Sequence, residues 1–343
     1  MELRRTLSRL SLILLAAAIV ATTIWAVLAL WFRLPVPELA RGLLAGVFGL
    51  LGITTVIALF TRYRRHVVIG YAVVFSSVLA WWSTIRPPID ADWSPDVARQ
   101  VTGTIEGDVL TLHDIRDFEW RGETDFSETW VTRSYDLTKL STLDLVMSYW
   151  AGPEMAHVIM SFGFEDGDYL AWAIEVRRRA GGAFSPIADL FKSNPLVIVA
   201  ADERDVIGLR SNIRREDVQL YRLNVSPAAA RALLLEYVSD ANELSATPQF
   251  YNSLTTNCTT TIWKMMRAVG DVAPFDWRLI VNGYLPEYAY SRGALTSGLP
   301  LQALKAAAHI DERAQAVGLS SPGFSQAIRL GVPSPLQDAP QSE

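Results

Sequence analysis

Three long apolar stretches at the start of the chain constrain its fold more than any other feature. They cover residues 10–32, 40–60 and 67–82 of 343. A helix that crosses a bilayer needs about 20 apolar residues, so each stretch predicts a membrane-spanning helix, the third when it is extended through Ile85. A cleaved signal peptide is excluded because the first apolar run is too long and two more follow it. Residues 1–85 are therefore predicted to form a membrane anchor.

The basic residues around these stretches predict how the anchor is oriented. One group precedes the first stretch and another lies between the second and third: Arg4, Arg5, Arg9, Arg62, Arg64, Arg65 and His66. Lys and Arg gather on the cytoplasmic side of membrane proteins. The N-terminus and the loop at 61–66 are therefore expected in the cytoplasm, and everything after the third stretch outside it.

The rest of the chain is expected to form one outer domain, at 86–330, with a disordered tail at 331–343 that is rich in Pro, Ser and Gln. The net charge of −5 and the lack of a Lys/Arg stripe outside the cytoplasmic loop argue against a nucleic-acid partner. A single cysteine excludes an internal disulfide.

The outer domain shows short alternating apolar runs that are typical of strands, followed by helical patterns. Strands are predicted at 102–105, 109–113, 129–135, 143–150, 157–164, 169–177 and 196–201, and helices at 228–244, 258–269 and 301–317. Asp166-Gly167 predicts a tight hairpin between two of these strands. The predicted class is α+β, a mainly antiparallel sheet with helices beside it.

The only cysteine, Cys258, lies in the first turn of a predicted helix that Asn257 caps and Gly270 ends. The positive end of the helix dipole and free backbone N–H groups favour a thiolate there. The same end of the helix, at Asn257 and Thr259, is expected to hold the oxyanion that forms when a thiolate attacks a carbonyl. The alternative is that Cys258 is a small buried apolar residue, as most unpaired cysteines are.

A thiolate nucleophile needs a base, normally one of the four histidines of the chain. His66 is excluded because it falls in the predicted cytoplasmic loop, and His309 lies in a charged terminal helix, where a solvated position is expected. His113, at the end of a predicted strand, remains a candidate. His157 opens an apolar strand, where a histidine is either a satisfied core residue or the edge of an active site. Glu175, on the neighbouring strand, is a candidate to orient His157, or else a solvent-facing partner of the arginines that follow it.

Metal and cofactor chemistry find little support in the sequence. There is no H-E-x-x-H and no paired cysteine, and the histidines are dispersed. We therefore expect neither a metal nor a cofactor. A serine hydrolase is also weakly supported, because no G-x-S-x-G motif is present.

Several separated blocks resemble the family of the Lnb N-terminal periplasmic domain, which is found in Lnb lipoprotein N-acyltransferases. The blocks are DWSPDVAR at 92–99, AHVIMSFGF at 156–164, Glu175, VAADERD at 199–205 and FYNSLTTNCTT at 250–260. The resemblance implies a permuted papain-like fold, similar to the NlpC/P60 group, in a periplasmic domain on the bacterial inner membrane. It implies Cys258 as nucleophile, His157 as base and Glu175 as orienting residue. The chain departs from Lnb itself in having three predicted spans before the domain.

Three functions remain open on the sequence alone. The first is acyl transfer through a thioester on Cys258, with a phospholipid or lipoprotein as substrate and an apolar groove lined by Ile159, Ile262 and Met266. The second is amide cleavage in peptidoglycan or protein, which would need polar surroundings for the thiol. The third is a binding domain that has lost activity. Oligomeric state is not encoded in any pattern we find.

Overall fold

The computed structural model describes residues 2–268, 270, 273–295 and 298–335. The chain divides into two compact units. The first holds residues 1–87 and 185–193, and the second holds residues 88–184 and 194–343.

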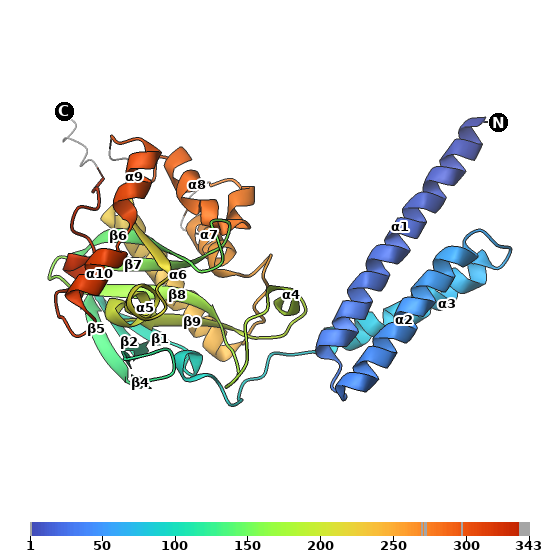
Figure 1. Cartoon of the computed structure of the whole chain (residues 1–343), viewed down its shortest axis with the longest axis horizontal. Coiled ribbons are helices and arrows are strands. Elements are labelled where there is room, and N and C mark those ends of the chain that lie inside the picture. The colour runs from blue at the N-terminus through green and yellow to red at the C-terminus, as the bar shows by residue number, and fades with distance from the viewer. Residues whose placement is uncertain (1, 269, 271–272, 296–297, 336–343) are drawn as a thin grey trace. The chain divides into compact units, whose positions relative to one another are not determined.

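The first unit contains the predicted membrane anchor. Its long helices, shown in Figure 1, are α1 (Glu2–Arg33), α2 (Glu38–Ala58) and α3 (Arg64–Thr84). Each contains a segment that is long and apolar enough to cross a membrane, at Leu10–Arg33, Glu38–Ala58 and Arg64–Thr84. Large apolar side chains are exposed along them, for example Leu39 at 78%. Such surfaces suit a lipid environment, because large exposed apolar surfaces are unfavourable in water.

Polar contacts join the helices inside this unit. The Tyr71 hydroxyl of α3 lies 2.7 Å from Thr22 Oγ1 and 3.0 Å from Thr23 Oγ1 of α1. Gly52 of α2 permits close approach, because a Cβ there would lie 2.3 Å from Thr23 Oγ1. Small residues of this kind let membrane helices pack tightly.

A short segment distant in sequence also belongs to this unit. It contains α4 (Pro186–Asp189). The Lys192 ammonium donates to the Trp82 carbonyl oxygen at 2.9 Å, and the Phe191 ring stacks on Phe32 at 5.7 Å between centroids. Residues 185–193 therefore lie against the C-terminal ends of α1 and α3.

The second unit is built on a sheet whose strand order is β1-β2-β9-β8-β7-β6-β10, with β5 paired to β2. The strands are β1 (Thr102–Glu106), β2 (Val109–Arg116), β3 (Glu119–Trp120), β4 (Phe126–Ser127), β5 (Trp130–Asp136), β6 (Leu140–Tyr149), β7 (Ala156–Phe164), β8 (Tyr169–Val176), β9 (Leu196–Ala201) and β10 (Asp217–Arg222). All neighbours in the main sheet are antiparallel except β2 and β9, which are parallel where Arg116 faces Ala201. The α+β class is confirmed, and the sheet is mixed rather than purely antiparallel.

Helices follow mostly in the second half of the chain. They are η1 (Pro95–Val97), η2 (Leu137–Lys139), α5 (Glu203–Gly208), the π-helical turn η3 (Leu209–Ile213), α6 (Pro227–Ala246), α7 (Cys258–Ala268), η4 (Trp277–Leu279), η5 (Asn282–Tyr284), α8 (Leu285–Ser291), α9 (Leu301–Ala308), α10 (Asp311–Val317) and α11 (Phe324–Ala327).

The helix predicted at 301–317 is wrong in one respect, because it breaks between α9 and α10. His309 forms a β-bridge with Gln219 of the edge strand β10, and the Ile310 N–H donates to the Val218 carbonyl oxygen at 3.0 Å. This pairing with the sheet edge takes the backbone out of the helix. Of the predicted tail, Val332 is buried, and residues 336–343 lie outside the described residues.

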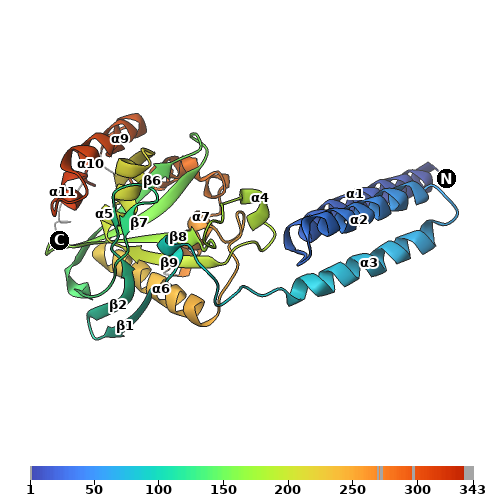
Figure 2. The same ribbon diagram turned by 60° about the horizontal axis from the view of Figure 1, so that its bottom comes forward.

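The sheet separates two apolar cores. In Figure 1, α5 lies in front of the strands and α6 behind them, and Figure 2 shows α6 running along the sheet. Because side chains alternate along a strand, Val158 and Met160 of β7 pack with α6 and α7, whereas Ile159 packs on the opposite face with α5, α10 and α11.

Candidate active site

Cys258 is the first residue of α7, and its side chain is buried. Asn257 caps this helix, since its Oδ1 accepts hydrogen bonds from the N–H groups of Thr259 at 3.0 Å and Thr260 at 2.8 Å. The cap fixes the first turn and thereby the direction of the thiol.

The same capping bonds involve the N–H groups of the expected oxyanion site at Asn257 and Thr259. The Thr259 N–H donates to Asn257 Oδ1, and the Asn257 N–H donates to Thr260 Oγ1 at 2.9 Å. Both N–H groups are bonded within the cap in this structure, and the oxyanion role of Asn257 and Thr259 stays a prediction.

The register of the β7–β8 hairpin brings His157 and Glu175 together. The pairs run from Gly163↔Tyr169 to Ile159↔Ala173, so continuing the register by two residues places His157 opposite Glu175. His157 Nε2 lies 3.1 Å from Glu175 Oε1. Both side chains are mostly buried, with 14% and 21% of their area exposed.

The Cys258 sulfur lies near the start of β7, at residues of this strand that are not paired with β8. The His157 side chain and the Val158 backbone N–H lie close enough to this sulfur to lower the pKa of the thiol. Two residues that are about a hundred positions apart in sequence therefore lie close together. Cys258, His157 and Glu175 form one cluster, in the order that a nucleophile, a base and an orienting group would require.

The electrostatics of the three groups reinforce each other. Burial raises the pKa of the Cys258 thiol, but the hydrogen bond and charge of His157 outweigh it, so the pKa lies below its ordinary value. Burial lowers the pKa of His157, but the Glu175 charge raises it, and the net direction is upward. Burial raises the pKa of Glu175, yet His157 and Arg210 together hold it well below its ordinary value. These directions favour a thiolate–imidazolium pair beside a carboxylate.

Sequence reasoning missed Arg210, which supports Glu175 from the other side. Arg210 Nη2 lies 2.8 Å from Glu175 Oε1, and Nη1 donates to the Val206 carbonyl oxygen at 2.7 Å. Arg210 belongs to the π-helical turn η3, a rare element that often marks functional positions. No sequence pattern predicts such a turn, so nothing marked Arg210 among the other arginines.

Asn282 was missed as well, and it contacts the sulfur. Its Nδ2 lies 3.5 Å from Cys258 Sγ. An Asn-Gly pair in a loop indicates a turn, and in the sequence Asn282-Gly283 carried no further signal.

The other histidines of this unit lie elsewhere. His113 is exposed and its Nδ1 lies 3.2 Å from Thr132 Oγ1 on β5. His309 is exposed and its Nδ1 lies 2.7 Å from Asp217 Oδ1 on β10. In the described part of the chain neither contacts Cys258.

An apolar cavity of about 290 Å³ lies directly beside this cluster. Val158 and Thr259 line it, and these residues are the chain neighbours of His157 and Cys258. The remaining lining residues are Leu143, Leu145, Met160, Leu223, Asn224, Val225, Ala229, Leu233, Ile262, Trp263, Met266, Ala273, Leu279, Leu285, Tyr288, Ala289, Arg292, Gly293 and Ala294.

Two of the three expected wall residues line this cavity. Ile262 and Met266 do so, and Ile159 does not. Ile159 faces the other core because it alternates with Val158 and Met160 along β7.

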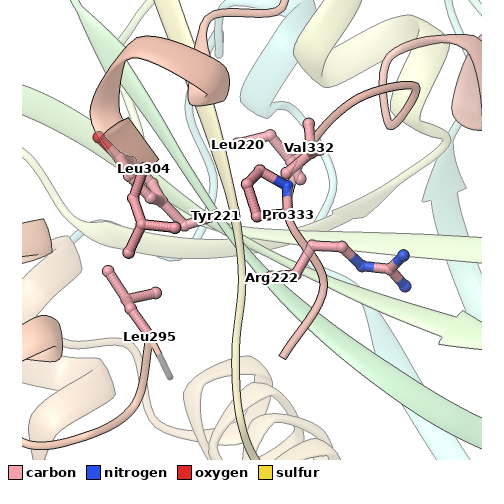
Figure 3. Close-up of a pocket in the computed structure, with 7 residues that line it drawn as sticks. All are labelled: Leu220, Tyr221, Arg222, Leu295, Leu304, Val332 and Pro333. Carbon is pink, nitrogen blue, oxygen red and sulfur yellow. The ribbon is translucent and has the colours of Figure 1, made fainter. Parts of the chain in front are cut away.

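A second hollow, at β10, is far smaller. Figure 3 shows it between Leu295, Leu304 and Pro333, with the Arg222 side chain extending away from the two leucines. Its volume is about 10 Å³, which is room for no more than one water molecule. It is not a site for a substrate.

Fold and site together define an α+β domain with apolar N-terminal helices and a buried cysteine beside a histidine and a glutamate. Residues 126–283 match the family model of the Lnb N-terminal periplasmic domain. The family resemblance predicted from sequence is thereby confirmed. The matched segment includes Cys258, His157, Glu175, Arg210 and Asn282. Comparisons with curated proteins and with solved structures give no match.

Proposed function

We propose that the protein is a membrane-anchored cysteine acyltransferase that takes an acyl group from a phospholipid or lipoprotein through a thioester on Cys258. The observation that carries this proposal is the cluster of Cys258, His157 and Glu175 beside an apolar cavity. The match of residues 126–283 to the Lnb domain family supports it. The order of a histidine strand, β7, before a cysteine helix, α7, supports a permuted papain-like arrangement.

The chemistry follows from the three side chains. His157 takes the thiol proton, and the thiolate attacks the ester carbonyl of the acyl donor. The ester C–O bond breaks, and His157 returns the proton to the departing alcohol oxygen. An amine then attacks the thioester and loses its proton to His157, while the C–S bond breaks. The amide forms and the sulfur leaves as the thiolate.

The cavity favours an acyl chain over a peptide or a sugar. Its volume is near the lower end of the range of about 300–1,000 Å³ for small-molecule sites. Asn224, Thr259 and Arg292 are the clearly polar or charged side chains among its lining residues. An amidase would instead hold sugars and peptide carboxylates through several polar groups.

Labelled substrate tests this proposal directly. Detergent-solubilised protein is incubated with phospholipid carrying a labelled acyl chain, and in parallel with a diacylated lipopeptide, then quenched in acid. We expect label on Cys258 that neutral hydroxylamine removes, from one donor or both. No adduct from either donor, together with release of peptides from purified cell wall, would overturn acyl transfer in favour of amide cleavage.

A matched pair of variants tests the cavity in the same assay. Ala229 lines the cavity at an exposed position, so Ala229→Trp narrows it with little strain. Ala228 is the exposed neighbour outside the lining. Ala229→Trp is expected to lower labelling by long acyl chains several-fold and to spare short ones, whereas Ala228→Trp has no effect.

The orientation of the chain is part of the proposal. The basic residues at 4–9 and 62–66 support a cytoplasmic N-terminus and a periplasmic domain at the bacterial inner membrane. A reporter that is active only after export, fused after Glu343, is expected to be active. Activity of a reporter that works only in the cytoplasm, at the same position, would reverse the topology.

A further inference from the structure

We infer that Asn282 is a positioning residue that fixes Cys258 against the strand of His157 and donates a hydrogen bond to its sulfur. This inference rests on the proposed role of Cys258 as nucleophile. It adds a residue from η5 to a site whose other members lie on β7, β8, η3 and α7.

The Asn282 side chain first binds the backbone at the start of β7. Its Nδ2 donates to the Ala156 carbonyl oxygen at 2.7 Å, and its Oδ1 accepts from the Ala156 N–H at 3.0 Å. This is the pair of bonds that a neighbouring strand would make. The pairing between β7 and β8 ends at Ile159. Beyond that point the Asn282 side-chain amide supplies the hydrogen bonds to the β7 backbone, at the residue directly before His157.

The second N–H of the same amide is directed at the start of α7. Asn282 Nδ2 lies 3.0 Å from Thr259 Oγ1 and 3.5 Å from Cys258 Sγ. One planar group therefore links the backbone before His157 to the sulfur of Cys258. Asn282 is buried, and a buried amide with all of its polar atoms bonded restricts motion of the groups it joins.

The backbone around Asn282 is anchored as firmly as its side chain. The Gly283 N–H donates to the Glu154 carbonyl oxygen at 3.0 Å, and its own carbonyl accepts from the Tyr149 hydroxyl at 2.8 Å. A Cβ at Gly283 would lie 2.1 Å from the Pro153 carbonyl oxygen, so only glycine permits this approach. The connection between β6 and β7 thus holds η5, and η5 holds the amide.

The chemical consequence is greatest for the thiolate. A neutral thiol is a weak acceptor, whereas an anionic sulfur accepts an N–H strongly. The bond from Asn282 therefore favours the nucleophilic form of Cys258. It also keeps the sulfur within reach of His157 while acyl groups enter and leave.

The test compares Asn282→Asp with Asn282→Ala, using iodoacetamide alkylation of Cys258 against pH in the full-length solubilised protein. Aspartate removes both N–H donors and places a carboxylate beside the sulfur. We expect the alkylation inflection to rise by about one pH unit or more. Alanine removes the donors without adding charge, so a smaller rise is expected. In acyl transfer, both variants are expected to lower kcat and leave KM nearly unchanged.

Asn224→Asp is the matched control, since Asn224 lines the same cavity and has no contact with Cys258 among the described residues. It is expected to leave the inflection unchanged. Circular dichroism and thermal unfolding establish whether each variant is folded. If the aspartate variant is unfolded, the alkylation inflection of the alanine variant is the test. An unchanged inflection in a folded Asn282→Ala protein overturns the inference. Because alkylation needs no acyl donor, this result is independent of the proposed substrate.

Discussion

Replacing Cys258 with serine is expected to lower acyl turnover by about 10⁴-fold or more while the protein stays folded. A serine hydroxyl is far harder to ionise than a thiol. Removing one catalytic group that acts together with its neighbours lowers kcat by orders of magnitude. The two side chains are nearly isosteric, and this one is buried in a packed site, so thermal unfolding should change little. The measurements are acyl transfer rates and absence of the hydroxylamine-sensitive adduct. Substantial residual turnover would exclude Cys258 as nucleophile.

The pH dependence of the wild-type site is part of the same prediction. The pKa of Cys258 is lowered and that of His157 is raised, so the two values lie closer together than in the free side chains, which favours the thiolate–imidazolium form. The sulfur gains a proton as the pH falls, and His157 loses one as the pH rises. Alkylation of Cys258 is therefore expected to show its inflection below the ~8.5 of a free thiol. His157→Ala removes the partner and leaves the burial, so the inflection should move upward. An ordinary inflection in the wild type would favour a merely buried cysteine.

Local patterns in the sequence were sufficient to predict the elements that carry the site. The apolar run at His157, the Asp166-Gly167 turn and the helix start at Cys258 each depend on residues close together in the chain. The structure has β7, the hairpin and α7 where these patterns place them. Helix caps and hairpin turns are encoded within a few residues, so such features can be read without knowing the tertiary fold.

The contacts within the site depend on tertiary structure and could not be read in the same way. A slip of one residue between β7 and β8 would place Glu175 on the other face of the sheet from His157, and periodicity alone does not fix that register. Arg210 reaches Glu175 only because η3 is a π-helical turn. Asn282 reaches Cys258 only because Gly283 lets the backbone approach Pro153. These residues are defined by packing between distant segments.

The second large effect is expected in stability, from Arg329→Met. The Arg329 guanidinium bridges two carboxylates that are completely buried, with Nε 2.8 Å from Asp144 Oδ2 and Nη2 2.6 Å from Glu203 Oε1. Methionine retains the apolar stem and removes the charge. Buried Glu203 then loses its cation, and Asp144 keeps only the Arg222 guanidinium, whose Nε lies 3.5 Å from Asp144 Oδ1. This change is expected to cost about 3–5 kcal/mol in the free energy of unfolding. Urea unfolding of the solubilised protein measures this loss.

A surface control and the pH dependence distinguish the electrostatic cost of Arg329→Met from a loss of packing. Arg231 pairs with Asp108 at a surface where both side chains are at least one third exposed, so Arg231→Met should cost less than about 1 kcal/mol. Burial already raises the pKa of Asp144 despite the charge of Arg329, and removing that cation raises it further. A folded state whose carboxyl pKa is raised binds protons more readily than the unfolded state, so its stability falls as pH rises through that pKa. The deficit of Arg329→Met should therefore be largest at neutral pH and shrink in acid. A deficit that is independent of pH would instead indicate lost packing around α11.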